Sequence, residues 1–149
     1  MSLRKRAIAG YESALEATHH GPTCLPFPLV FVEVGSSEAQ WNDKAACAVA
    51  AATIAGLVQD EPSGCEVPSA IGLGGGHYCR KFSEVEDYAL GHICPRYNLP
   101  NLDEEMLGQM IERTVPRPGH ALVDKKGLGP HKKEVSDLLS KTGLEVVGV

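Results

Sequence analysis

Aromatic residues are scarce in this chain of 149 residues, which has one tryptophan, four tyrosines and three phenylalanines. Its core must therefore be filled mainly by alanine, valine, leucine and isoleucine. No run approaches the ~18 apolar residues that a membrane span needs, so we expect no membrane partner. With 43% apolar and 22% charged residues, the composition is typical of one globular domain that spans residues 1–149.

Cysteine is also sparse, and its pattern excludes two kinds of site. The five cysteines contain no CxxC pair, which argues against a disulfide framework and against a cysteine zinc site. Arg4, Lys5 and Arg6 are followed by no apolar segment, so a secretory signal is not expected. These features predict a cytoplasmic protein with reduced thiols.

Several common catalytic and nucleotide-binding motifs are missing. The chain has no GxSxG, no HExxH, and no GK[ST] after its glycine run. It also lacks the helix with a third glycine that completes a dinucleotide-binding fingerprint. A cysteine nucleophile stays open as an alternative, because Cys79 lies two residues from His77.

Acidic residues outnumber basic ones overall, and the formal net charge is −5. From residue 113 onward the balance reverses, with seven lysines and arginines against four acids. A protein that grips a polyanion needs a positive patch rather than a positive total, so this tail is a candidate polyanion-binding surface. Its candidate contacts are Lys125, Lys126, His131, Lys132 and Lys133. An ordinary solvated helix face explains the charges equally well.

Helical and strand patterns alternate along the chain. Helices are predicted over residues 3–17, 38–58, 102–113 and 131–141, with a short one inside 78–88. Ser36 or Ser37 is expected to cap the second helix, whose alanine-rich middle predicts close packing on a sheet, and Asn101 to cap the helix at 102–113. Strands are predicted over 29–34, 67–73, 91–94, 121–124 and 144–147, with a turn at 60–64. This order predicts an α/β fold of three layers, with a mostly parallel or mixed sheet of about five strands between helices.

Histidines gather where ligands bind in such folds, at the carboxyl ends of the strands. His77 follows Gly74, Gly75 and Gly76, whose backbone amides can point at a ligand's oxygen atoms as an oxyanion hole or phosphate cradle. A flexible turn with an exposed histidine is the alternative for this run. His19 and His20 precede the first predicted strand.

Two other polar residues stand in apolar surroundings. Glu33 lies within the run LVFVEV, where an unpaired buried carboxylate is costly, so it is either a metal ligand or general base or a residue that reaches solvent. His92 is either a metal ligand or a hydrogen-bonded core histidine.

The same residues carry a resemblance to a known family. The runs THHGPT (18–23), VFVEVGSSE (30–38), AIGLGGGHY (70–78), ALGHI (89–93) and KKGL (125–128) resemble, in this order, the archaeal and plant D-aminoacyl-tRNA deacylases. Family members are usually longer, and the chain resembles their later part.

This resemblance implies hydrolysis of the ester between a D-amino acid and tRNA, with D-aminoacyl-tRNA as substrate. It also implies zinc as cofactor and a fold like those of peptidyl-tRNA hydrolases and nucleoside phosphorylases. The implied metal candidates are His19, His20, Glu33, His77 and His92, and we expect His77, Glu33 and His20 to carry catalysis. The alternatives are a catalytically incomplete domain that binds tRNA or a nucleotide, and a nucleoside-type phosphorylase or hydrolase. A homo-oligomer is a further expectation.

Overall fold

The computed structural model describes residues 8–22, 25–59 and 67–149, which group into two compact units. Unit 1 comprises residues 1–13 and 29–64, and unit 2 comprises residues 14–28 and 65–149. Each unit is described by itself. None of the described helices is long and apolar enough to cross a membrane.

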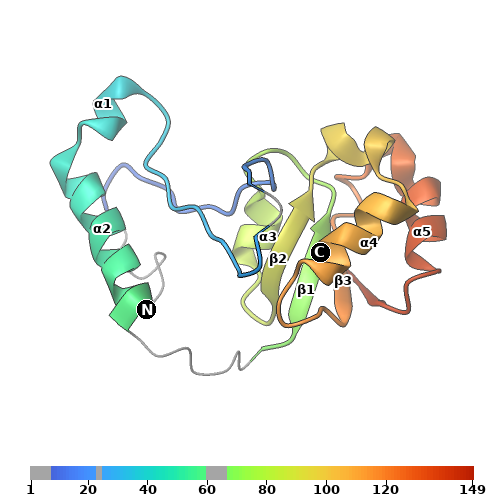
Figure 1. Cartoon of the computed structure of the whole chain (residues 1–149). Coiled ribbons are helices and arrows are strands. Elements are labelled where there is room, and N and C mark those ends of the chain that lie inside the picture. Colours follow the sequence, from blue (N-terminus) through green and yellow to red (C-terminus); the bar gives the residue numbers. More distant parts are fainter. Residues whose placement is uncertain (1–7, 23–24, 60–66) are drawn as a thin grey trace. The chain divides into compact units, whose positions relative to one another are not determined.

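Unit 2 is built on a sheet of four parallel strands, coloured green to red in Figure 1. The strands are β1 (Ser69–Leu73), β2 (Ala89–Cys94), β3 (His120–Val123) and β4 (Glu145–Gly148), in the spatial order β2-β1-β3-β4. The α/β class and the parallel sheet are confirmed. Four of the five predicted strands are present, within a few residues of the predicted bounds.

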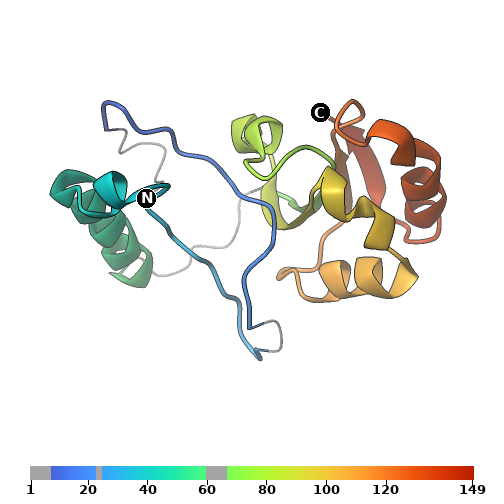
Figure 2. The same cartoon turned by 90° about the horizontal axis from the view of Figure 1, so that it is seen from above.

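Helices cover both faces of this sheet. Figure 2 shows α3 (Arg80–Glu84) and α4 (Glu104–Glu112) on opposite sides of the strands. Helix α5 (Lys132–Leu139) lies on the α4 side, since side chains of both helices belong to one core cluster. Two short 3-10 helices, η2 (Arg96–Asn101) and η3 (Gly129–His131), complete the unit.

The core has two parts, one on each face of the sheet, because successive side chains along a strand point to opposite faces. Ile71 and Val123 face the helices α4 and α5, where Leu107 and Leu139 are buried with them. On the other face, Ala70 and Leu122 pack with Phe82 of α3 and with Ala17. The core is aliphatic apart from Phe82, as the composition predicts.

Helix α4 begins two residues later than predicted. Its cap is Asp103, whose Oδ1 accepts the Met106 amide at 2.8 Å, and Asn101 instead ends η2.

Unit 1 contains α1 (Glu38–Trp41) and α2 (Lys44–Gln59), which together replace the single helix predicted over 38–58. The break falls at Asp43, whose Oδ1 accepts the Ala45 amide at 2.8 Å and whose Oδ2 accepts the Tyr11 hydroxyl at 2.9 Å. Ser37 is the first cap but makes no side-chain bond to the α1 backbone. The described part of unit 1 holds no strand, so packing of α2 on a sheet within that unit is not seen.

Two predicted elements are absent from the described chain. Residues 29–34 form no strand, because a strand needs a neighbour to accept its backbone bonds and no ladder partner is present there. Residues 8–17 are not helical either, and the backbone groups of Leu15 and Ala17 bond instead to residues far along the chain. Residues 3–7 of that prediction and the turn at 60–64 lie outside the described residues.

Candidate functional site

The strand order places one crevice at the carboxyl edge of the sheet. The chain leaves β1 toward β2 on one side and leaves β3 toward β4 on the other, so the two connections diverge between β1 and β3. Ligands of open α/β sheets bind at such a divergence. The segments that flank it are the glycine run after Leu73 and the loop after Val123.

The glycine run forms a sharp bend, here called the glycine bend (Gly74, Gly75 and Gly76). Gly74 and Gly75 have φ of +104° and +77°, a region that favours glycine. The Gly74 amide donates to the Cys94 carbonyl at 2.9 Å, so it is not available to a ligand oxygen. In the described chain, no protein acceptor is recorded for the amides of Gly75 and Gly76, which leaves these two of the predicted three as candidate oxyanion donors.

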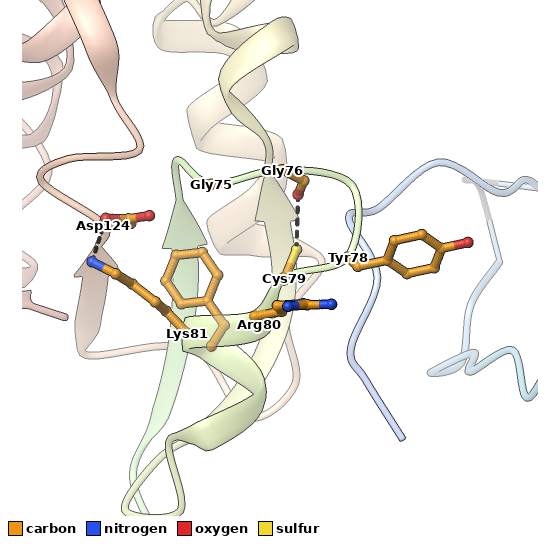
Figure 3. Close-up of a pocket in the computed structure, with 8 residues that line it drawn as sticks. Gly75, Gly76, Tyr78, Cys79, Arg80, Lys81 and Asp124 are labelled. Carbon is orange, nitrogen blue, oxygen red and sulfur yellow. Dashed lines mark hydrogen bonds and ion pairs between the residues drawn. The ribbon is translucent and has the colours of Figure 1, made fainter. Parts of the chain in front are cut away.

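Two pockets lie beside the glycine bend. The smaller, of about 220 Å³, is the Lys81 pocket; Figure 3 shows its lining residues Gly75, Gly76, Tyr78, Cys79, Arg80, Lys81, Phe82 and Asp124. The larger, of about 390 Å³, is the Arg96 pocket, lined by Gly75, Gly76, Arg96, Tyr97 and Gly127.

Asp124 carries a charge that is compensated locally. Burial opposes ionisation of this carboxylate, but the Lys81 ammonium at 2.7 Å and the backbone amides of Gly127 and Lys126 lower its pKa. The Lys81 Nζ also donates to the Val149 carbonyl at 3.1 Å. Asp124 therefore acts as a structural anion that holds the loop after β3.

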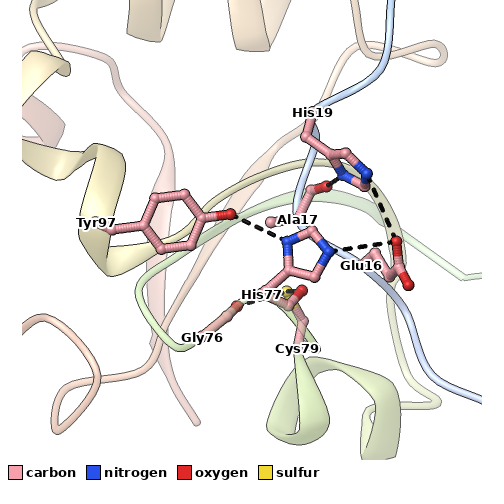
Figure 4. Close-up of polar contacts among 7 residues, drawn as sticks. All are labelled: Glu16, Ala17, His19, Gly76, His77, Cys79 and Tyr97. Atoms are coloured by element: carbon pink, nitrogen blue, oxygen red, sulfur yellow. Dashed lines mark hydrogen bonds and ion pairs between the residues drawn. The ribbon is translucent and has the colours of Figure 1, made fainter. Parts of the chain in front are cut away.

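Next to the bend, three side chains form what we call the histidine cluster (Glu16, His19 and His77). The Nε2 atoms of His77 and His19 lie 3.6 Å and 3.7 Å from Glu16 Oε2. Figure 4 shows both rings turned toward this carboxylate. Ligand atoms from all three residues lie within 4.8 Å of one another, and the side chains remain between 31% and 39% exposed, open to solvent and substrate.

The outer nitrogen of each ring in the histidine cluster has its own partner. His19 Nδ1 lies 2.6 Å from the Ala17 carbonyl, which can only accept, so Nδ1 carries the proton. His77 Nδ1 lies 3.2 Å from the Tyr97 hydroxyl. In a neutral His19 the Nε2 lone pair therefore faces a carboxylate, a repulsive arrangement that either a proton or a metal cation would relieve.

Backbone pairing explains why these residues meet. Glu16 and Tyr78 form an isolated antiparallel bridge, in which the Ala17 amide donates to the His77 carbonyl at 2.9 Å. The Thr18 amide donates to the Ile93 carbonyl at 3.0 Å, which fixes the same segment against the end of β2. Ala17 is 2% exposed and anchors the segment in the core.

The other predicted metal ligands lie outside the histidine cluster. The ring centroid of His20 is 4.1 Å from that of His19, so His20 is a close neighbour. Glu33 belongs to unit 1 and is exposed there. His92 is half-buried, with Nδ1 at 3.5 Å from the Thr18 hydroxyl and a hydrogen bond to the Arg113 backbone, which is the environment of a core histidine.

The candidate tRNA contacts fall on two adjacent segments. Lys125 and Lys126 are exposed in the loop after β3, and the Arg96 pocket includes Gly127 of that loop. Lys132 and Lys133 are exposed in the first turn of α5, and His131 precedes them in an ion pair with Glu134 at 3.4 Å.

Cys79 is unsuited to act as a nucleophile. The thiol is 2% exposed and donates weakly to the Gly76 carbonyl, and burial raises its pKa to about 11. The thiolate required for attack is therefore scarce near neutral pH.

Sequence reasoning missed Glu16, Tyr97 and Arg96. Glu16 falls inside the helix predicted over residues 3–17. Had that segment been taken as extended, an acid three residues before a double histidine would have been a candidate member of the site. Tyr97 and Arg96 follow Pro95 at the end of β2, and only the strand order brings them next to the glycine bend.

Known proteins share both the sequence and the fold. The chain is 40% identical over 150 residues to the D-aminoacyl-tRNA deacylase of Cenarchaeum symbiosum, covering 99% of this chain and 57% of that protein. It is 43% identical over 144 residues to the D-aminoacyl-tRNA deacylase of Ignicoccus hospitalis, covering 94% of this chain and 57% of that protein. The chain thus spans little more than half the length of these curated relatives.

A solved structure resembles the whole chain as well. The crystal structure of a conserved protein of unknown function matches with a TM-score of 0.84 and 28% sequence identity, covering 98% of this chain and 52% of that one. The family model for D-aminoacyl-tRNA deacylase matches residues 1–147. The resemblance seen in the sequence motifs is therefore confirmed: the chain belongs to the D-aminoacyl-tRNA deacylase family.

Proposed function

We propose that this protein hydrolyses the ester bond between a D-amino acid and tRNA in the cytoplasm. The observation that carries the proposal is the convergence of Glu16, His19 and His77 beside the glycine bend, at the carboxyl edge of the sheet. The names of the relatives give the substrate class, and the histidine cluster supplies groups suited to activate water. Association with a second copy of the chain stays a prediction.

The residues of the histidine cluster fit a zinc ion. Two imidazoles and one carboxylate are the donor set of many catalytic zinc sites, and such sites keep a further position open. Both rings already have an outer partner on Nδ1, which is how metal-bound histidines are usually held. When bound, Zn²⁺ supplies a Lewis acid and lowers the pKa of water to about 7.

The chain's own groups account for the remaining tasks. His20 lies beside the histidine cluster and is suited to take the proton of the attacking water. The Gly76 amide is suited to donate to the oxyanion that forms when water attacks the ester carbonyl. Glu33 is not used in this proposal, because it belongs to unit 1.

The basic residues after β3 and at the start of α5 are proposed to contact the phosphates of the acceptor arm. Lys125, Lys126, Lys132 and Lys133 are all exposed and carry no recorded ion pair with an acid in the described chain. Phosphate contacts make binding weaken steeply with salt. We therefore expect KM for charged tRNA to rise between 50 mM and 200 mM salt.

Release of D-tyrosine and L-tyrosine from charged tRNA tests the proposal. We expect hydrolysis of the D-ester only, and a loss of about 10²-fold or more in Glu16→Gln and in His77→Ala, in line with the loss of a general base or metal ligand. Glu145→Gln is the matched control, because Glu145 also faces a histidine Nε2, that of His120 at 3.4 Å, but lies at the opposite edge of the sheet.

The results separate the alternatives. Full activity in both Glu16→Gln and His77→Ala would exclude the histidine cluster as the centre. Tight tRNA binding without hydrolysis would instead indicate a binding domain, whether the protein holds one zinc ion or none.

A further inference from the structure

The Arg96 pocket lies next to the histidine cluster, and the two share a residue. Tyr97 lines the pocket, and its hydroxyl lies 3.2 Å from His77 Nδ1. Tyr97 therefore contacts both the pocket and the histidine cluster. The pocket volume of about 390 Å³ falls within the range of small-molecule sites.

The charge on the pocket wall is positive. Arg96 is the charged residue among the lining residues, and no carboxylate in the described chain is recorded within ion-pair distance of its guanidinium. Lys125 and Lys126 stand beside Gly127 in the loop that closes the pocket. The acid on that loop, Asp124, is compensated by the Lys81 ammonium at 2.7 Å.

Backbone contacts fix Arg96 in place. Its amide donates to the Gly75 carbonyl at 3.0 Å, which ties it to the glycine bend. Its side chain runs along the loop after β3, since a Cβ built on Gly129 would lie 3.2 Å from Arg96 Cδ. These contacts place the Arg96 side chain beside the loop after β3, and its planar guanidinium group suits phosphate oxygens.

We propose that the Arg96 pocket binds the phosphoryl group of the terminal nucleotide of the substrate, while the ester carbonyl lies at the histidine cluster. This inference rests on the proposed function for the identity of the substrate. The amino acid of an aminoacyl ester carries an ammonium group, so the phosphates are the anions that the substrate offers to Arg96. Only the ribose separates the phosphate from the ester in this nucleotide, and Tyr97 contacts both the pocket and His77.

A pair of small substrates isolates the phosphate contact. We compare 2′(3′)-O-D-tyrosyl adenosine with the same ester bearing a 5′-phosphate. In the unaltered protein the 5′-phosphate is expected to raise kcat/KM about 10-fold or more, as a charge-assisted contact should. Arg96→Gln should remove this advantage, so that the ratio of the kcat/KM values for the two esters falls to about one.

Arg117→Gln is the matched control. Arg117 is also exposed, but it lies in the loop before β3, at the amino edge of the sheet. We expect this variant to keep the full advantage of the 5′-phosphate. An equal loss on both substrates in Arg96→Gln, or a retained phosphate advantage in that variant, would overturn the inference.

Calorimetric measurement of the binding of adenosine 5′-phosphate and of adenosine distinguishes a failure of this inference from a failure of the proposed function. If the protein hydrolyses neither ester but binds adenosine 5′-phosphate more tightly than adenosine, and Arg96→Gln abolishes the difference, the pocket assignment stands and the proposed function fails. If the unaltered protein binds the two compounds equally, the pocket assignment is wrong, whatever the hydrolysis assay shows.

Discussion

Tyr97 connects the two parts of the candidate site through a single hydroxyl group. Its oxygen lies 3.2 Å from His77 Nδ1, and the opposite ring nitrogen of His77 faces Glu16 at 3.6 Å. A partner on the outer nitrogen holds the orientation of the ring. Tyr97 is therefore a positioning residue, which acts on the reaction through His77.

Removing this hydroxyl should weaken the site without removing any group that touches the ester. For Tyr97→Phe we expect zinc affinity and D-ester hydrolysis each to fall about 10–100-fold. The ¹⁵N shifts of the His77 ring should also change, which a loss of packing alone would not cause. Zinc competition with a chelator and NMR of the labelled ring measure the two effects.

Tyr78→Phe is the control for this substitution. Tyr78 is 53% exposed, its ring lies 5.2 Å from that of His77, and its hydroxyl makes no recorded hydrogen bond in the described chain. Unchanged ¹⁵N shifts in Tyr97→Phe would show that the hydroxyl does not position His77.

At the scale of the elements, the caps decide where helices begin. Asp103 starts α4 through its bond to the Met106 amide, with two further acids, Glu104 and Glu105, in the first turn. Acidic groups at this end interact favourably with the helix dipole. The sequence prediction named Asn101 as the cap, and the structure has Asp103, two residues later.

Asp103→Ala should therefore lower the free energy of unfolding by about 1 kcal/mol. Asn101→Ala should change it by less than about 0.5 kcal/mol, because residue 101 ends η2 and lies on the surface. Urea denaturation followed by circular dichroism measures both values. A larger loss in Asn101→Ala than in Asp103→Ala would reverse the cap assignment.

Elements with a strong local pattern were predictable, and elements that depend on distant partners were not. The strands β1 and β3 are short apolar runs between turn residues, and the glycine bend is visible as three consecutive glycines. The segment before the double histidine has helical composition, yet its amides and carbonyls pair with residues 77–79 and 93. That pairing is about 60–75 positions away along the chain, beyond the reach of local propensity.

The same distinction applies to the site. His19 and His77 were identified because histidine and glycine in these runs are chemically conspicuous, and the structure brings their rings to 4.7 Å. Glu16 was missed because one acid among several in a predicted helix has no distinguishing pattern. Arg96 and Tyr97 gain their significance from the order β2-β1-β3, which only the folded sheet reveals.

For the molecule as a whole, His92 links folding of unit 2 to pH. Burial lowers the pKa of His92, the charge of Arg113 lowers it further, and the hydrogen bond to the Arg113 backbone opposes the shift. Since the folded-state pKa lies below the unfolded value of about 6.5, the unfolded chain takes up the proton first as the pH falls. The neutral ring thus contributes stability that is complete above about pH 6.5 and is lost as the pH falls through the folded-state pKa.

His92→Gln should remove this part of the pH dependence, because glutamine does not titrate. Between pH 8 and pH 5 we expect the free energy of unfolding of the unaltered protein to fall more steeply than that of the variant. Urea unfolding at several pH values measures both slopes. Parallel slopes would show that His92 has the same pKa in the folded and unfolded chain.

The crossing of the glycine bend with the loop after β3 has an evolutionary consequence. A Cβ on Gly127 would come well inside 3.0 Å of the Gly75 amide nitrogen and of Asp124 Oδ2, while one on Gly74 would touch the Asp124 carbonyl oxygen at 3.0 Å. The glycine bend and the loop after β3, about fifty positions apart in the sequence, thus pack so closely that a side chain added to one requires the other to shift. Related proteins that lack glycine at one of these positions should therefore also differ in the facing loop. The two loops should change together in evolution rather than one at a time.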